Sequence, residues 1–325
     1  MDDPKSSVNL HTERKIILFA ALVFMIWSAV FIFRTSFIAI DGKRYFCLFD
    51  DAMISIRYAW NFSHGMGLVW NIGERVQGYT NLLMTLIMSL ATLIFDKSTA
   101  ALVIQILGVG IMLAIGYASV KIADHILGEK TDAAQRVLIR ILAFIFALSY
   151  YPLTYWTLTG METGLLTVLL LFGILSAFNY HRSRKASDLF QTAIYLGLAF
   201  LTRNDSLIFA FLIWAYLIGE ILTKKRNDRI FVPFFSAIFV YSIFILGQFL
   251  FQYLYYGELL PNTYILKLTG MPLFDRVSNG LGFIFPFLVQ ISFILLPAIL
   301  ESFRHYQKKK LLLLSLFLYG EPYAQ

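Results

Sequence analysis

The chain has 325 residues, a mass of 37.3 kDa and a formal net charge of +7; hydrophobic residues make up 58% of it, charged residues 14%, and its mean hydropathy is +0.70. A soluble domain carries about 25% charged residues, so this composition excludes a soluble globular protein and makes the lipid bilayer a partner. The basic residues form short clusters between apolar runs, which favours membrane topology over nucleic-acid binding, and no nucleic-acid partner is expected. The single cysteine, Cys47, excludes a disulfide framework.

Apolar runs of spanning length recur along the chain after a polar tail, residues 1–15. The first run ends at Arg34 instead of a small-residue cleavage site, so it predicts an anchor and not a signal peptide. A shorter run, 189–201, is able to cross where the membrane thins or where its end lies in a cavity. The runs of full length are 16–33, 99–120, 138–156, 163–180, 206–222, 230–253 and 280–300.

The basic clusters predict the topology. The positive-inside rule assigns the clusters around 5–15, 121–140, 182–185, 224–229 and 304–310 to the cytoplasm. We therefore expect residues 34–98, 157–162, 202–205 and 254–279 to lie outside. This assignment requires that residues 81–95 do not cross, because a crossing there would invert every later cluster.

The pattern of residues 81–95 agrees with that requirement. Asn81, Thr85, Ser89, Thr92 and Asp96 recur at helical spacing and form one polar stripe on an otherwise apolar helix. Such a helix, about 22 Å long, is too short for a hydrocarbon core of about 30 Å. We expect it to lie in the membrane interface.

These patterns predict an all-α polytopic membrane protein. Residues 1–15 form a cytoplasmic tail, and residues 16–325 form one transmembrane domain with an external loop at 34–98. The last apolar run, Leu311 to Tyr319, has nine residues and is too short to span. We expect the chain to be cut short within a further helix.

Paired carboxylates stand out in the external loop. Asp50 and Asp51 begin a predicted helix on which Asp50, Ile54, Arg57 and Tyr58 share one face. Adjacent carboxylates repel each other, which raises the affinity of one for a proton and of the pair for a metal. The alternative is that one aspartate only caps the helix.

Further ionisable residues lie at the outer ends of predicted spans. Glu162 lies in the turn TLTGME, and Arg203 and Asp205 lie in TRND. An ionisable residue so close to lipid is a functional candidate, although Arg203 and Asp205 are also able to form a purely structural pair.

The segment GELLPNTYILK brings more polar side chains to this face. Glu258, Asn262, Tyr264 and Lys267 are its candidates, and the alternative is a re-entrant turn set by Pro261.

The motifs resemble a known family. Residues 50–81 read DDAMISIRYAWNFSHGMGLVWNIGERVQGYTN. They resemble the first external loop of the GT-C superfamily of glycosyltransferases, most closely the group of the terminal arabinofuranosyltransferase of actinobacterial cell walls, whose loop looks like DDAYISFRYA and then GHGLVFNPGERVEGYTN. TGMET, LTRND in place of LTRPD or LTRPE, and LLPNTYILK in place of LPNTYYAK follow in the same order. The resemblance covers residues 16–280, with Met53 for an aromatic residue, Gln77 for Glu and Asn204 for Pro as departures.

The resemblance implies a GT-C-like helix bundle whose first external loop carries juxtamembrane helices. It also implies an inverting glycosyltransferase that moves a sugar from a polyprenyl-phosphate donor to an envelope glycan or glycolipid acceptor. The membrane would be the bacterial inner membrane, with the active site on its extracytoplasmic side.

The resemblance and the chemistry of the residues assign expected roles. Asp50 would be the general base, Asp51 its neighbour, and Glu162 a second acid; a divalent cation, Mg²⁺ or Mn²⁺, would be held by Asp51 and Glu162. Cationic side chains suit the donor phosphate, because they stabilise the charge that develops on the leaving group. The candidates for donor phosphate are Arg57, Arg203 and Lys267, and those for substrate are Tyr58, Glu74, Tyr79, Asn81, Asp205, Asn262 and Tyr264.

The main alternative is a polytopic transporter or lipid flippase. Such a protein places ionisable residues near the middle of the membrane on broken, pairwise-related helices. In this sequence the acids lie at the outer ends of the spans, and no half resembles the other.

Overall fold

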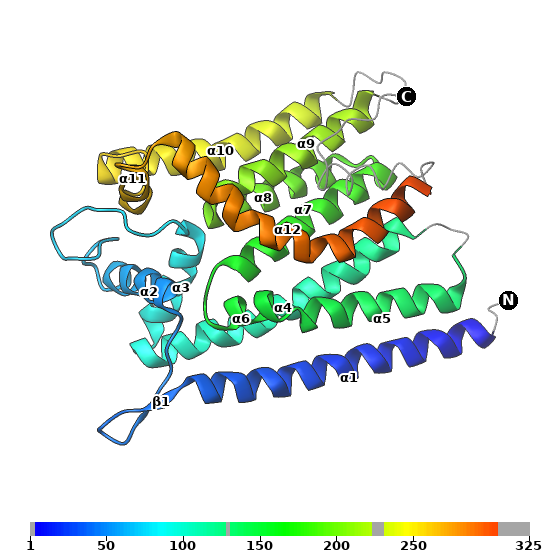
Figure 1. The fold of residues 1–325 in the computed structure, drawn as a ribbon, viewed down its shortest axis with the longest axis horizontal. Coiled ribbons are helices and arrows are strands. Elements are labelled where there is room, and N and C mark those ends of the chain that lie inside the picture. Colours follow the sequence, from blue (N-terminus) through cyan, green and yellow to red (C-terminus); the bar gives the residue numbers. More distant parts are fainter. Residues whose placement is uncertain (1–3, 128–130, 223–230, 305–325) are drawn as a thin grey trace.

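A computed structural model describes residues 4–127, 131–222 and 231–304 (Figure 1). Most of these residues are helical, and the strands in them are a two-residue antiparallel pair, β1 (Phe37–Ile38) and β2 (Arg44–Tyr45). The chain is an all-α polytopic membrane protein, as the composition and the apolar runs predict. Residues 311–319, the predicted further helix, lie outside the described residues. The helices are α1 (Pro4–Thr35), α2 (Asp50–Ser63), α3 (Leu82–Ile94), α4 (Lys97–Ile126), α5 (Ala133–Ser149), α6 (Tyr151–Leu158), α7 (Thr163–Ser183), α8 (Ala186–Thr202), the 3₁₀ turn η1 (Asn204–Ser206), α9 (Leu207–Leu222), α10 (Phe231–Tyr256), α11 (Asn262–Leu268) and α12 (Leu273–Arg304).

Within the described residues, five helical segments are long and apolar enough to cross a membrane: 11–35, 97–126, 163–183, 204–222 and 231–256. Helices α5 and α6 form a sixth candidate as a broken span, bent by 53°. The break lies at Tyr150 and is followed by Pro152 in the first turn of α6, where a missing N–H and a fixed φ are tolerated. The predicted run 138–156 is therefore two helices. The predicted run 280–300 lies in α12, whose side chains are described only in part.

The long helices run side by side, and the two ends of the bundle differ (Figure 1). At one end, which we call the basic end, lie the start of α1, the end of α4 and the α7–α8 connection. At the other, which we call the site end, lie α2, α3, α11 and the turns that precede α7 and η1 (Figure 1). Helix α3 lies at the site end and does not run the length of the bundle, which is what the charge argument requires of residues 81–95.

Helix α3 packs with its polar stripe inward. Thr85, Ser89 and Thr92 are buried, whereas Leu90 is 65% and Leu93 63% exposed. The stripe lies against α2, where Ser63 Oγ is 3.0 Å from Thr92 Oγ1. The periodicity predicts the helix, but its hydroxyl groups are paired with protein instead of facing water. Leu90 and Leu93 are among the side chains left for lipid.

The start of α2 is fixed against the turn between α6 and α7. The amide of Phe49 donates to the carbonyl of Thr159 at 2.8 Å, and the Phe49 and Trp156 rings meet edge to face at 4.7 Å. Gly160 has φ +88°, and a Cβ there would lie 2.8 Å from the side chain of Leu48. The positive φ favours glycine at this position, whereas the end of the Leu48 side chain would only have to move aside. The contact brings the first residues of α2 next to the turn that carries Glu162.

Candidate functional site

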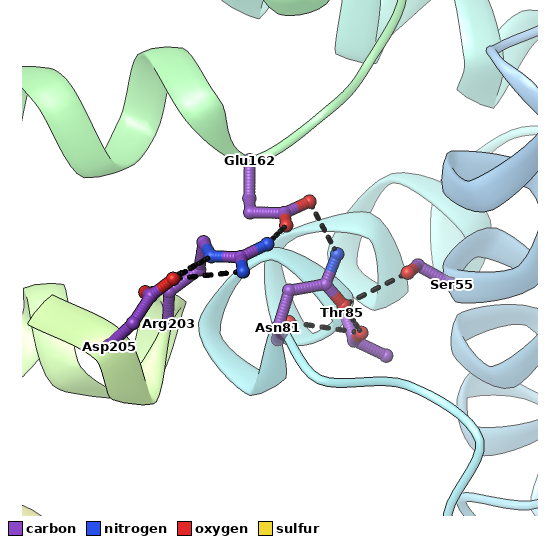
Figure 2. A network of polar contacts seen from close by, with 6 residues as sticks. All are labelled: Ser55, Asn81, Thr85, Glu162, Arg203 and Asp205. Atoms are coloured by element: carbon purple, nitrogen blue, oxygen red, sulfur yellow. Dashed lines mark hydrogen bonds and ion pairs between the residues drawn. The ribbon is translucent and has the colours of Figure 1, made fainter. Parts of the chain in front are cut away.

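Glu162 is the centre of a polar network at the site end (Figure 2). The residue precedes α7, and its side chain is 3% exposed. One oxygen, Oε1, accepts a hydrogen bond from Arg203 Nη1 at 2.9 Å, and the other, Oε2, accepts one from Asn81 Nδ2 at 2.9 Å. A buried carboxylate is stable when it is paired and hydrogen-bonded in this way. The turn TLTGME therefore places its acid inside the protein.

Asn81 is held in one orientation by two hydroxyl groups. Its Oδ1 accepts a hydrogen bond from Ser55 Oγ at 2.9 Å and lies 3.1 Å from Thr85 Oγ1 (Figure 2). Because hydroxyl donors fix the carbonyl side of the amide, its NH₂ group is directed at Glu162. Residues from α2, α3 and the start of α7 meet at this point.

Arg203 links Glu162 to Asp205. Its Nε and Nη2 donate to the Asp205 carboxylate at 2.9 to 3.1 Å, and these bonds, followed by the one to Glu162, raise the pKa of Arg203. The pair that the sequence leaves open as structural does form, and it includes Glu162 as well. Two carboxylates and one guanidinium give the trio a formal charge of −1. Arg203 is thus a weak attractor for a donor phosphate in this arrangement.

Asp50 and Asp51 are the first residues of α2, and both are exposed. Neither carboxylate is hydrogen-bonded to another group in the described part of the chain, so the capping alternative is not realised by a side-chain bond. Asp51 lies one helical turn before Ser55, which places it on the side of α2 that faces the Asn81 network. Asp50 shares its side of α2 with Arg57, about 10 Å along the helix.

Arg57 keeps part of its guanidinium available. Its Nε donates to the carbonyl of Trp70 at 3.2 Å, and its Cζ lies 4.3 Å from the centre of the Trp70 ring. Stacking on an aromatic face orients the planar group without using its terminal nitrogens. In the described structure Arg57 suits a phosphate oxygen better than Arg203 does.

Tyr58 and Tyr79 hold the loop between α2 and α3. Each is 2% exposed, and their rings meet edge to face at 5.1 Å. Tyr58 Oη donates to the Val76 carbonyl and accepts from the Gly78 amide, both at 2.9 Å, and burial raises the pKa of both phenols. Both rings are buried in this structure, where they pack the loop, and their predicted role as substrate ligands stays a prediction. Glu74 is not joined to them in the described part of the chain: it is exposed and accepts a hydrogen bond from Asn71 at 3.0 Å.

The segment before α11 contacts the same loop. The Asn262 amide donates to the Gln77 carbonyl at 2.9 Å, which joins the motif ERVQGYTN to the motif LLPNTYILK. The Asn262 side chain is exposed, and Tyr264 is 50% exposed. Lys267 lies in α11, but its side chain is outside the described part of the structure.

Sequence reasoning missed the side chains that support this loop from α2 and α10. Ser55 holds Asn81, Gln252 Nε2 donates to Gln77 Oε1 at 3.1 Å, and Tyr256 Oη donates to the Leu68 carbonyl at 2.7 Å. Gln248 and Gln252 stand four residues apart in a helix that is otherwise mostly apolar. That spacing was the available signal, because a polar stripe in a span predicts a polar neighbour.

The predicted metal ligands are only partly in place. Each oxygen of Glu162 already accepts a hydrogen bond, so a metal there would compete with Arg203 or Asn81. Among the described residues, no group of three or more His, Cys, Asp or Glu side chains is close enough to hold an ion. The assignment of Mg²⁺ or Mn²⁺ to Asp51 and Glu162 stays a prediction.

Comparison of the chain with protein-family models, with curated proteins and with solved structures finds no match. The class that the structure defines is an integral membrane protein with a buried acid–arginine–amide network at one end of its bundle.

Proposed function

We propose that the protein is an inverting glycosyltransferase that takes a sugar from a polyprenyl-phosphate donor and transfers it to an envelope glycan or glycolipid acceptor. The bacterial inner membrane is its proposed location, with the site end on the extracytoplasmic side. The observation that carries the proposal is the juxtaposition of an exposed carboxylate pair, Asp50 and Asp51, with the buried network of Glu162. All of these residues belong to the motifs that resemble the GT-C superfamily.

In the proposed reaction, the acceptor hydroxyl oxygen forms a bond to the anomeric carbon on the side opposite the phosphate. The bond between that carbon and the phosphate oxygen breaks, and polyprenyl phosphate leaves with the electron pair. The hydroxyl proton passes to the Asp50 carboxylate, which is exposed and has no competing hydrogen bond in the described structure. A positioned base of this kind contributes about 10²- to 10⁴-fold to the rate.

Arg57 is the proposed partner of the donor phosphate. It lies on the same side of α2 as Asp50 and about 10 Å from it, which leaves room for one sugar between base and phosphate. Its stacking on Trp70 orients the guanidinium before the donor binds. Glu162, Arg203 and Asn81 act in this proposal by fixing the α6–α7 turn against which α2 begins.

An apolar groove of about 530 Å³ supports a lipid-linked donor. Phe19 and Trp27 of α1 form one wall, and Leu148 of α5 and Tyr151 of α6 form the other. Helix α6 leads directly into the turn that carries Glu162. A polyprenyl chain in this groove would lie along the bundle and approach the site end with its phosphate.

The distribution of ionisable groups favours an enzyme over the alternative, a transporter or flippase. In the described part of the chain, the ion pairs gather at the two ends of the bundle. Arg203 pairs with Glu162 and Asp205 at the site end; Arg184 pairs with Glu220 at 3.0 Å and Arg140 with Glu13 at 3.2 Å at the basic end. A transporter would be expected to hold such groups midway.

The test is transfer of radiolabelled sugar from a panel of polyprenyl-phosphate donors to envelope extract. Membranes would carry the unmutated chain, Asp50→Asn, Asp275→Asn or no added protein. Asp275 is a matched control because it is an exposed aspartate in the first turn of α12. We expect incorporation with the unmutated chain and with Asp275→Asn, and a loss of at least about 100-fold with Asp50→Asn.

Two outcomes would overturn parts of the proposal. Full activity in Asp50→Asn would remove Asp50 as the base. No incorporation from any donor, combined with movement of a labelled donor across reconstituted vesicles, would replace the enzyme with a flippase.

A further inference from the structure

A polar cavity of about 330 Å³ lies at the site end between residues 75–77 of the α2–α3 loop and residues 256–265. Besides Tyr256, whose Oη already donates to the Leu68 carbonyl, four polar residues line it: Arg75, Gln77, Glu258 and Asn262. Two contacts hold Gln77 in this lining: the Asn262 amide donates to its carbonyl, and Gln252 donates to its Oε1. The cavity is therefore built from two loops that are fixed to each other.

The four polar side chains leave hydrogen-bonding groups unused. Arg75 and Glu258 line the same cavity with opposite charges, yet no salt bridge joins them in the described structure. Arg75 instead lies over the Tyr255 ring, with 5.0 Å between its Cζ and the ring centre. The described hydrogen bonds of Gln77 use its two carbonyl oxygens, so its NH₂ group is available. Arg75 and Glu258 are both exposed, so the guanidinium and the carboxylate are open to a third partner.

The balance of charge and surface indicates the chemistry of that partner. One cation and one anion leave no net charge, which argues against a phosphate or another strong anion. The carboxylate, the guanidinium and the two carboxamides offer both donors and acceptors, and Val76, Leu260 and Ile265 add aliphatic surface. Alternating donors and acceptors beside aliphatic patches match a neutral polyhydroxylated ring, which carries hydroxyl groups on its rim and C–H groups on its faces.

We propose that this cavity binds a neutral sugar of the acceptor. That this sugar belongs to the acceptor rests on the proposed glycosyltransferase function. That the cavity binds a sugar rests on its lining residues alone. Glu258 accepts from two ring hydroxyl groups, Gln77 and Asn262 donate to ring oxygens, and Arg75 closes the cavity from its place on Tyr255. Loop residues 75–81 join the cavity to Asn81 and hence to the Glu162 network.

The experiment uses the full chain in detergent micelles and saturation-transfer NMR with methyl glycosides of arabinofuranose, mannopyranose, galactopyranose and glucopyranose. We expect saturation transfer to at least one glycoside. Glu258→Gln and Asn262→Ala should each weaken its binding about tenfold, the effect of losing one charge-assisted or buried hydrogen bond. Asp275→Asn, at the same end of the bundle but outside the cavity, should leave binding unchanged. Each variant's thermal transition is recorded, and Glu258→Gln is the decisive variant because it changes charge without changing shape.

Three results separate this inference from the proposed function. Equal glycoside binding by Glu258→Gln and the unmutated chain, or displacement of the glycoside by inorganic phosphate, would overturn the sugar site. Sugar transfer with an acceptor KM that is unchanged in Glu258→Gln would also overturn the site while leaving the enzyme in place. Glycoside binding that depends on Glu258, in a chain that transfers no sugar, would support the cavity and overturn the enzyme.

Discussion

The side-chain amide of Asn81 donates to Glu162 Oε2 at 2.9 Å, joining the residue before α3 to the residue before α7. The hydroxyl of Ser55 fixes the other side of that amide, and Arg203 holds the other oxygen of Glu162. Three segments of the chain therefore meet at one carboxylate, and Asn81 joins α2 to them as a fourth. Since Phe49, the residue before α2, is also bonded to Thr159 in the turn before Glu162, the position of Asp50 depends on this network.

Arg203→Ala should destabilise the protein because it leaves Glu162 buried and without its cation. Removal of one partner of a buried pair costs about 3 to 5 kcal/mol, and the 39% exposure of the Arg203 side chain places the expected loss near the lower figure. The double variant Arg203→Ala/Glu162→Gln should recover a large part of that loss, because a neutral amide is less costly to bury.

A double-mutant cycle in mild detergent measures this coupling from the free energies of unfolding of the four proteins. Asp205→Asn is the matched control, since Asp205 is 56% exposed and its removal leaves the bond between Arg203 and Glu162 in place. Additive effects of Arg203→Ala and Glu162→Gln would contradict the paired role of these side chains.

Ser55 and Thr85 should substitute for each other in holding Asn81. Each hydroxyl lies within hydrogen-bonding distance of Asn81 Oδ1, so loss of one leaves the other. Ser55→Ala or Thr85→Ala alone should cost about 1 kcal/mol and leave most of the transfer activity. The double variant should lose more stability than the sum, and activity should fall with it, because the amide is then free to turn away from Glu162. Equal, additive losses in thermal stability and activity would mean that the amide is oriented by something else.

The helical class and most helix positions could be predicted from the sequence because spans must satisfy their backbone groups internally and bury few charges. Residues 81–95 show where this reasoning stops. A polar stripe of Thr85, Ser89 and Thr92 predicts a helix with two faces, but periodicity does not say whether protein or water lies against the polar face. The answer depends on α2, whose Ser55 and Ser63 supply the partners from a distance in sequence.

The candidate site could be predicted as a set of residues but not as an arrangement. The turn TLTGME and the segment TRND were recognisable because each places an acid or an arginine at the end of a span. Which residues pair required the packing of α3 against α2 and of α7 against α8. Tyr58 and Tyr79 show a further limit of the sequence. An aromatic residue in a functional loop is equally suited to bind a substrate or to support the loop by packing.

The orientation of α3 predicts a large difference between two neighbouring positions. Met88 is fully buried against α2 and α4, whereas Leu90 is 65% exposed. Met88→Ala should cost about 2 to 5 kcal/mol through the lost burial and the cavity that remains. Leu90→Ala should cost less than about 1 kcal/mol, because its side chain leaves no cavity in the protein. Thermal unfolding of the two variants in the same detergent checks this, and equal losses would mean that α3 is rotated about its axis.

Gly108 sets how closely α4 approaches α6. A Cβ at this position would lie 2.7 Å from the backbone carbonyl oxygen of Thr157, an atom that no side-chain rotation moves away. Gly108→Ala should therefore push α6 outward, cost about 1 to 3 kcal/mol and shift the turn that carries Glu162. Gly110→Ala on the same helix is the control: no atom lies within 4 Å of its added Cβ, and alanine favours the helix by about 1 kcal/mol. Gly108→Ala acts on the site only through α6, so it should lower transfer activity as well as melting temperature. Gly110→Ala should preserve activity and raise or maintain the melting temperature. A Gly108→Ala protein with normal stability and activity would show that α6 is free to move without disturbing Glu162, and the network would then have to be positioned by α2 and α8 alone.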